Sequence, residues 1–339
     1  MEFAHLHVAS AYSLRHGASM PSELAAHAAE HGQPLLALTD RDGVYGAVRF
    51  VQACAAHGIA PVLGVDLALD LPHVGDAQSP LPPVIGVSPT RGGAWVDPRH
   101  PRAVLLARDR RGWASLCHLI SAVHSTRATE GGHADARGVA ATMEQIAAHS
   151  DGLIAMLGPH SPLLEALAVQ RPDLADSLVA PWHEIFGDAL RIEIVSHRAP
   201  RGTLSTITAA RALGWARERG ITPVLTHAVR YATPRQARVV DVLDSARRLV
   251  PLDERHRDRP NAQGFLAPTS FMAEIADEIA RAAGAGRRIA RDLLAAAVET
   301  AQECALTPAD LGIGEIAVPE LDVITSPASV GVGGGGFGS

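Results

Sequence analysis

The sequence predicts an α/β fold, and three observations lead to this prediction. Short apolar runs of strand length recur from the N-terminus to about residue 227. Amphipathic stretches of helical length separate most of these runs, so that strands and helices alternate as they do around a parallel sheet. Glycine or proline stands at the ends of several stretches, where helices begin and end. The 339 residues, 47% of them hydrophobic, are enough for a large core.

Seven apolar runs are predicted to be strands. The run PLLALTD is typical of a buried strand, because its apolar residues are continuous and it ends in polar ones. The predicted strands are 3–8, 34–40, 61–69, 103–108, 152–158, 189–195 and 222–227. Strands that alternate with helices in this number favour a barrel-like fold, in which functional side chains lie at the carboxyl ends of the strands.

The stretches between the strands are predicted to be helices. The first begins at Pro21, which suits the first turn, and ends before Gly32. The second ends before Gly58 for the same reason. The predicted helices of this part are 21–31, 44–57, 112–123, 161–170, 203–219 and 234–248. Residues 72–101 and 126–139 are rich in Pro, Gly and polar side chains, and we expect surface loops there.

The pattern changes after residue 250. Two helical stretches, 270–282 and 287–303, follow a charged segment with no strand between them, and the chain ends in the low-complexity stretch GVGGGGFGS. We therefore predict three parts: a barrel domain, a helical junction and a glycine-rich tail without packed structure. Their predicted limits are 1–255, 256–323 and 324–339.

The composition excludes several classes of protein. A formal net charge of -6 gives no overall basic surface for nucleic acid, although all 30 basic residues are Arg and a local basic patch stays open. The 3 cysteines form no CxxC motif, so a disulfide framework or cysteine zinc site is not expected. We see neither a signal peptide nor a membrane-spanning run, and we expect a cytoplasmic protein without membrane contact.

Several potential metal ligands lie at the predicted strand ends. In HLHVAS, His5 and His7 alternate along an extended segment and so face one side. Further His and Asp side chains stand at other strand ends, and together they suggest a metal-dependent hydrolase, since each cation takes several ligands. The candidates are His5, His7, Asp40, Asp66, His160 and His227. The alternative is chance, because the chain contains 17 His.

Four sequence blocks carry a resemblance to a known family. AHLHVASAYSLRHGAS, LALTDRDGVYGAVRFVQACAAHGIAPVLGVDL and PVLTHAVRYATP together resemble the N-terminal region of the alpha subunit of bacterial DNA polymerase III, including its error-prone relatives. LLARDRRGWASLCHLIS is similar to the segment after the family's fourth strand. The resemblance covers about residues 3–320 and implies a PHP domain (polymerase and histidinol phosphatase), a distorted (β/α)7-type barrel followed by a helical junction.

The resemblance implies a metal site whose ligands are mostly replaced. The family's LHxHS motif appears as LHVAS, its TDHD motif as TDRD, and its late NDVHY-like motif as HAVRY. Asp66 stands where the family has a Glu, Arg102 where it has a His, and Pro159 where it has a Cys. The remnant ligand positions are His7, Asp40 and Asp66, and the lost positions are Ala9, Arg41, Arg102, Pro159, Ala228 and Arg230.

These replacements predict that the barrel binds no metal and has no catalytic residue. Arginine offers no lone pair to a cation and repels it, and Ala and Pro carry no donor atom. We expect Arg41, Arg102 and Arg230 to form an ion-pair cluster with Asp40 and Asp66 at the barrel mouth. Two alternatives stay open: each Arg points to solvent, or the arginines form a pocket for phosphate or the DNA backbone.

The resemblance also implies a function and partners. Polymerase chemistry and its Mg2+ belong to a palm domain that this sequence does not contain, so no cofactor is expected in this chain. RPDLAD and VPELD only superficially match the acidic palm motif, and we predict that Asp173, Asp176 and Asp322 are surface carboxylates. We expect a structural or subunit-docking role in a replicative or error-prone polymerase. The implied partners are the rest of the alpha subunit, a proofreading exonuclease or other replisome subunits, and DNA through the full-length protein.

Two other functions compete with this one. The first is an active metal-dependent PHP phosphoesterase or 3′–5′ exonuclease, which the six lost ligand positions disfavour. The second is a stand-alone enzyme similar to histidinol phosphatase, which would require intact histidines and no helices at 270–303.

Overall fold

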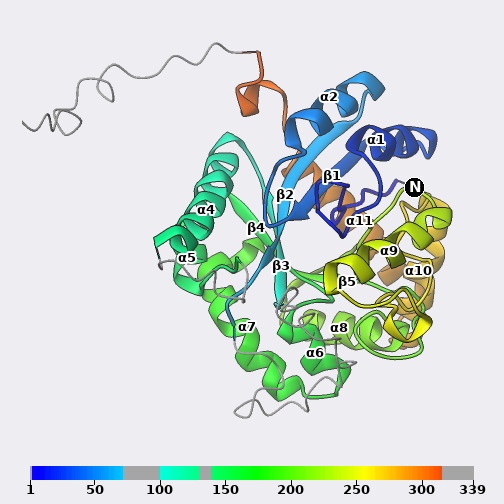
Figure 1. Cartoon of the computed structure of the whole chain (residues 1–339). Helices are drawn as coiled ribbons and strands as arrows, with labels where there is room; N and C mark the ends of the chain where they lie inside the picture. The colour runs from blue at the N-terminus through cyan, green and yellow to red at the C-terminus, as the bar shows by residue number, and fades with distance from the viewer. Residues whose placement is uncertain (1, 72–99, 130–138, 315–339) are drawn as a thin grey trace, which may run out of the picture.

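A six-stranded sheet forms the centre of the molecule (Figure 1). The computed structural model describes residues 2–71, 100–129 and 139–314. The strands are β1 (Leu35–Arg41), β2 (Ala60–Ala68), β3 (Arg102–Ala107), β4 (Leu153–Leu157), β5 (Leu190–Ile194) and β6 (Thr222–Leu225), and they lie side by side in this order. The apolar runs therefore predicted these six strands to within two residues at each end.

The N-terminal segment links the two edges of the sheet. Residues 3–8 were predicted to be a strand, and in the structure they form only isolated bridges, from His5 to Leu36 on one side and from Val8 to Val229 on the other. The amide of Ala37 donates to the His5 carbonyl at 2.9 Å, and the amide of Val229 donates to the His7 carbonyl at 2.9 Å. Because β1 and the segment after β6 both pair with these residues, the sheet curls into the distorted barrel that the sequence predicted.

Strand β3 corrects the prediction of a parallel sheet. It runs antiparallel to both β2 and β4, whereas the other three strand pairs are parallel. Helices α4 (Arg110–Thr129) and α5 (Met143–Ala148) lie between β3 and β4. They return the chain to the end of β3, where the amide of Arg108 donates to the carbonyl of Gly152 at 3.0 Å. A connection that returns to its starting end produces antiparallel neighbours.

The direction of β3 also positions its first residue. In the register of the sheet, Arg41 stands opposite Asp66, and Arg102 stands opposite Ala68. The amino end of β3 therefore lies at the carboxyl ends of β1 and β2. Arg102, from the beginning of β3, therefore lies beside Arg41 and Asp66, which come from the ends of β1 and β2.

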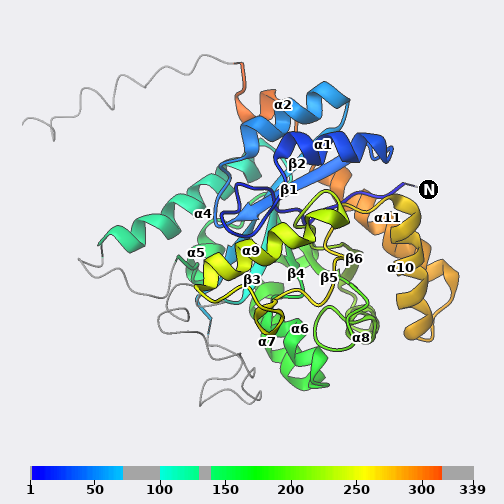
Figure 2. The ribbon, with the colours of Figure 1, turned by 45° about the vertical axis from the view of Figure 1, so that its right-hand side comes forward.

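Helices surround the sheet (Figures 1 and 2). The remaining helices are α1 (Pro21–Glu30), α2 (Ala47–His57), α6 (Pro162–Ala168), α7 (Pro172–Phe186), α8 (Thr206–Glu218), α9 (Ala237–Arg248), α10 (Thr269–Ala282) and α11 (Arg287–Glu303). Gly58 ends α2 in the left-handed conformation that glycine adopts without strain. The sequence analysis did not predict α5, whose six residues are too few for a visible helical period; a Thr142–Gln145 capping box begins it.

Helix α7 carries the RPDLAD sequence. Asp173 pairs with Arg171, and Asp176 accepts hydrogen bonds from Trp215 and Arg219 at the protein surface. Asp173 and Asp176 are therefore surface carboxylates that pair with neighbouring side chains. Asp322 lies outside the described residues.

Helices α10 and α11 pack against the barrel and share its hydrophobic core. The amide of Leu306 donates to the Pro61 carbonyl at 2.9 Å, and Gln33 and His5 both bind the carbonyl of Ala267 at 2.9 Å. The boundary near residue 255 stays a prediction, and the predicted tail lies outside the described residues, as do most of the two predicted loops. In the described part of the chain, no helix has the length and apolar character that crossing a membrane requires.

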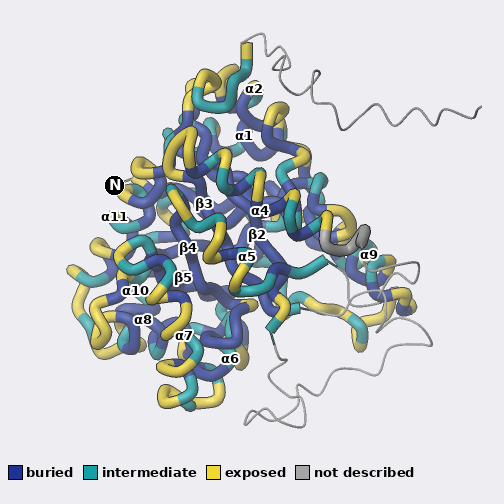
Figure 3. Tube along the Cα trace, turned by 90° about the vertical axis from the view of Figure 1, so that its left-hand side faces the viewer, coloured by how far each residue is buried: buried dark blue, intermediate teal, exposed yellow. Residues whose placement is uncertain are grey.

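Burial follows the layers of the fold. The strands are buried along nearly their whole length, and exposed residues concentrate on the outer faces of the helices and in the loops (Figure 3). Apolar side chains from the strands and from α1, α2, α8, α10 and α11 form one continuous core. This core fixes the strand ends that carry the polar residues described next.

One half-buried acid within this frame, Glu165, makes stability depend on pH. Burial raises the pKa of Glu165 on α6 to about 7, and its carboxylate has no hydrogen-bond or ion-pair partner among the described residues. The unfolded chain releases this proton at a lower pH than the folded chain does. Stability is therefore highest below the unfolded pKa and is lost as pH rises towards the folded pKa.

We predict that Glu165→Gln stabilises the fold by about 1–2 kcal/mol at about pH 8 and changes little at about pH 5. Melting temperatures and denaturant titrations at both pH values measure this difference. Glu184→Gln, at an exposed position of α7, is the control and should have no such pH dependence. An equal effect of Glu165→Gln at the two pH values would contradict the assignment.

Candidate functional site

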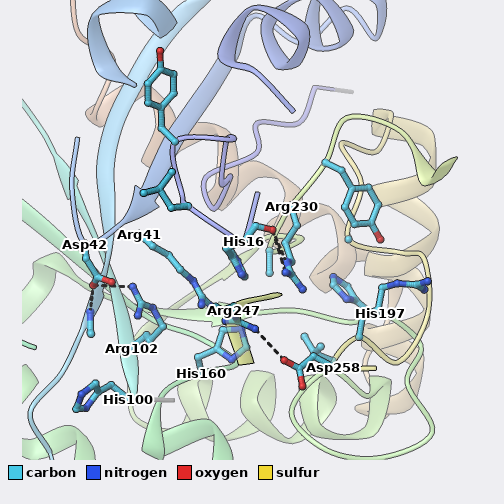
Figure 4. A pocket seen from close by; sticks show the side chains of 18 of the residues that line it. His16, Arg41, Asp42, His100, Arg102, His160, His197, Arg230, Arg247 and Asp258 are labelled. Carbon is cyan, nitrogen blue, oxygen red and sulfur yellow. Dashed lines mark hydrogen bonds and ion pairs between the residues drawn. The ribbon is translucent and has the colours of Figure 1, made fainter. Parts of the chain in front are cut away.

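A cavity of about 530 Å3 opens at the end of the barrel where the polar strand ends converge (Figure 4). The end of β1 contributes Arg41, the start of β3 contributes Arg102, and the segments after β4 and β6 contribute His160 and Arg230. Most of the charged residues that line it are arginines: Arg41, Arg102, Arg230, Arg247 and Arg259, with Asp42 and Asp258 as the acidic members. The cavity thus lies where the resemblance places the metal site.

Asp66 on β2 binds two of these arginines. Its Oδ2 accepts a hydrogen bond from Arg41 Nε at 3.2 Å, and its Oδ1 accepts one from Arg102 Nε at 2.9 Å. Asp66 is only 2% exposed. Burial opposes ionisation, but Arg102 and Arg41 hold the pKa of this carboxyl well below its usual range. The carboxylate is therefore ionised at neutral pH, and both of its oxygens are occupied by guanidinium groups.

Arg102 binds a second carboxylate that the sequence analysis did not include in the cluster. Its terminal nitrogen donates to Asp42 Oδ1 at 2.9 Å. Asp42 adopts a left-handed backbone conformation with φ 55°, and its Oδ1 also accepts the amide of Ala68. Burial works against the Arg102 charge, but Asp42 and Asp66 raise the pKa of Arg102.

Asp40 has a different environment from Asp66. Its carboxylate accepts hydrogen bonds from the Ser10 amide at 2.7 Å, the Ser10 hydroxyl at 2.9 Å and the Ser13 hydroxyl at 2.6 Å. Burial raises the pKa of Asp40, and these hydrogen bonds oppose that effect. Asp40 fixes the loop after the N-terminal segment, and among the described residues its carboxylate forms no ion pair with the arginines.

Arg230 belongs to a second ion-pair group. Its guanidinium donates to both oxygens of Asp244 on α9, at 2.6 and 3.0 Å, and to the carbonyl of His16. Arg247 also binds Asp244 at 2.9 Å and Asp258 at 3.0 Å. Arg41 and Arg102 therefore form an Asp66 group, and Arg230 and Arg247 form an Asp244 group that lines the same cavity.

His7 binds a glutamate that the sequence analysis missed. His7 Nδ1 donates to Glu193 Oε1 on β5 at 2.7 Å, and the Thr226 hydroxyl donates to the same oxygen. Burial by itself lowers the pKa of His7, but Glu193 and Asp66 raise it overall. A single acidic residue inside the apolar run ALRIEIV was the signal that would have identified Glu193.

The other candidate ligands are dispersed. His5 Nε2 binds the Ala267 carbonyl, and His227 lies buried among His197, Phe265 and Phe271 with no hydrogen-bond partner for either ring nitrogen in the described structure. His160 lines the cavity and is accessible from it.

The replaced ligand positions Ala9, Pro159 and Ala228 are buried and carry no side-chain donor.

These residues do not fit the metal cluster that the resemblance implies. Within the described ranges, no group of three or more His, Cys, Asp or Glu side chains is arranged to hold a metal ion. The two oxygens of Asp66 are bound to the guanidinium groups of Arg41 and Arg102. A cation at this position would also lie beside the fixed charges of Arg41 and Arg102, which repel it.

Comparisons with known proteins agree with the resemblance. The PHP domain family matches residues 5–197. The error-prone DNA polymerase of Symbiobacterium thermophilum is 33% identical over 286 residues, which are 81% of this chain and 23% of that protein. The DNA polymerase III subunit alpha of Caulobacter vibrioides is 28% identical over 294 residues, 85% of this chain and 23% of that protein. The chain thus spans about a quarter of the length of these relatives.

A solved structure is also similar to this chain. It is an amidohydrolase from Chromobacterium violaceum, with a TM-score of 0.42 and 16% sequence identity. The match covers 66% of this chain and 86% of that one.

The Asp66 group generates a prediction about stability. We predict that Asp66→Asn lowers the free energy of unfolding by about 3 kcal/mol, because it leaves the buried guanidinium of Arg102 and the half-buried one of Arg41 without their shared counter-ion. Chemical denaturation at neutral pH measures the change. Asp173→Asn, which removes an exposed partner of Arg171, is the matched control and should have no measurable effect. Equal effects of the two substitutions would contradict a stabilising role for the cluster.

Proposed function

Because this chain belongs to the PHP domain family, we propose that it is a non-catalytic N-terminal region of a DNA polymerase III alpha subunit, replicative or error-prone. One observation carries the proposal: Arg41 and Arg102 bind both oxygens of Asp66, where the resemblance expects metal ligands. Ion pairs between guanidinium and carboxylate groups replace metal–ligand bonds in this interpretation. The barrel mouth is then held together without a cation.

The relatives support the polymerase assignment. Homologues over most of this chain are error-prone DNA polymerases and DNA polymerase III alpha subunits. In this proposal the polymerase reaction, its Mg2+ and the contact with DNA belong to parts of the protein outside this chain, and the site described here requires no cofactor. The barrel supports the polymerase region structurally and provides a surface for a proofreading exonuclease or another replisome subunit in the cytoplasm.

The site does not favour an active phosphoesterase or 3′–5′ exonuclease. Such an enzyme would need Asp66 to release its two arginines and to bind cations beside them. Breaking a buried ion pair lowers the stability of the fold, and no other interaction in the described residues compensates for that loss.

We predict that the purified chain contains almost no Zn, Mn or Fe and that EDTA does not lower its melting temperature. Elemental analysis per mole of protein and melting curves with and without chelator measure this. Incubation with Mn2+ should release no nucleotide from a DNA 3′ end. Two or more metal equivalents, or a loss of several degrees with EDTA, would show that other side chains form a functional site.

A further inference from the structure

The cavity at the barrel mouth combines many fixed hydrogen-bond donors with few accessible acceptors. Five arginines line it, whereas only two lining residues of the described structure are carboxylates. Asp66 and Asp244, which bind four of these arginines, are almost completely buried behind them, whereas Asp241, which binds Arg259, is half-buried. The two most buried acids therefore lie in the wall of the cavity, behind the guanidinium groups.

The carboxylates hold the arginines in defined positions. Arg230 binds Asp244 through two hydrogen bonds, and Arg259 binds Asp241 in the same way at 2.7 and 2.6 Å. Arg102 is fixed between Asp66 and Asp42. A guanidinium that is already immobilised loses little further conformational freedom when it binds an anion. The wall is therefore preorganised for a negatively charged ligand.

Arg41 supplies donors that the chain itself does not use. Its Nε binds Asp66, and its two terminal nitrogens have no hydrogen-bond partner in the described structure. Its side chain extends into the cavity towards His160 and Arg247 (Figure 4). A guanidinium edge with two free N–H groups matches two oxygens of a phosphate.

The electrostatic environment inside the cavity also favours an anion. Burial lowers the pKa of Arg41, and the neighbouring Arg102 lowers it further. Burial and the charges of Arg230 and Arg41 lower the pKa of His16. For both of these groups, nearby cations disfavour a further positive charge. An anion at the same place would relieve this repulsion.

We propose that the cavity binds a phosphate group without a metal ion, with Arg41 and His160 as its contacts. The phosphate is free inorganic phosphate or the terminal phosphate of a nucleotide or DNA strand. A cavity of about 530 Å3 has room for a ligand of nucleotide size. The inference rests on the proposed function, because it requires that arginines and not cations occupy the barrel mouth.

Calorimetric titration of the whole chain in EDTA tests the proposal. The probes are inorganic phosphate, deoxyadenosine 5′-monophosphate and one oligonucleotide with and without a 5′-phosphate. We expect saturable binding that weakens as KCl is added, since charged contacts are screened by salt. The probe that binds most tightly identifies the source of the phosphate, and dependence on the 5′-phosphate distinguishes a strand end from the DNA backbone.

Two variants locate the binding site. Arg41→Gln should weaken binding roughly tenfold or more, because it removes a charge-assisted contact. His160→Glu should abolish binding and not lower the melting temperature, since His160 is accessible and the new carboxylate lies beside arginines. Arg171→Gln, before the start of α7 and outside the lining of the cavity, is the control and should bind as the unchanged chain does.

The other outcomes are distinguishable. If no probe binds in EDTA and the chain contains no metal, the inference is wrong and the proposed function stands. Binding that neither variant weakens would also overturn it, because the ligand would then lie elsewhere. Binding that requires Mn2+ would overturn both the inference and the proposed function.

Discussion

The shared carboxylate of Asp66 is the interaction on which the barrel mouth depends. It joins the end of β1 to the beginning of β3 through Arg41 and Arg102, with β2 between them. The buried charge of Arg102 and the half-buried charge of Arg41 require such a partner, because an isolated charge inside a protein is far less stable than one in water. The same pairing occupies the oxygens that a metal ion would need. One interaction thus stabilises the site and determines its chemistry.

The direction of β3 makes this pairing possible. In a fully parallel sheet the first residue of a strand would lie at the opposite end of the barrel from Asp66. The antiparallel β3 instead brings Arg102 to the carboxyl ends of its neighbours. Loop residues complete the arrangement: Asp42 turns back in a left-handed conformation and binds Arg102 from the other side. The mouth is assembled from strand ends, a strand beginning and loops.

The sequence predicted the strands and most helices, because apolar runs and helix-stopping glycines are local signals. The direction of β3 was not predictable in this way, since it depends on where α4 and α5 return the chain. The convergence of Arg41, Arg102 and Asp66 followed from the family resemblance. The actual partners did not: Asp40 binds Ser10 and Ser13, and Arg230 binds Asp244 on a helix that folds back over the mouth. Which partner each side chain binds depends on tertiary geometry rather than on the spacing of residues in the sequence.

The closure of the barrel by residues 3–8 has a consequence for the order of folding. This segment pairs with Leu36, its neighbour in the chain, and with Val229, which follows β6. A ribosome must have synthesised and released residue 229 before the second pairing can form. Contacts between such distant positions close a long loop and slow folding. The native positions of His5 and His7 therefore require contacts with residues that are synthesised much later than β1.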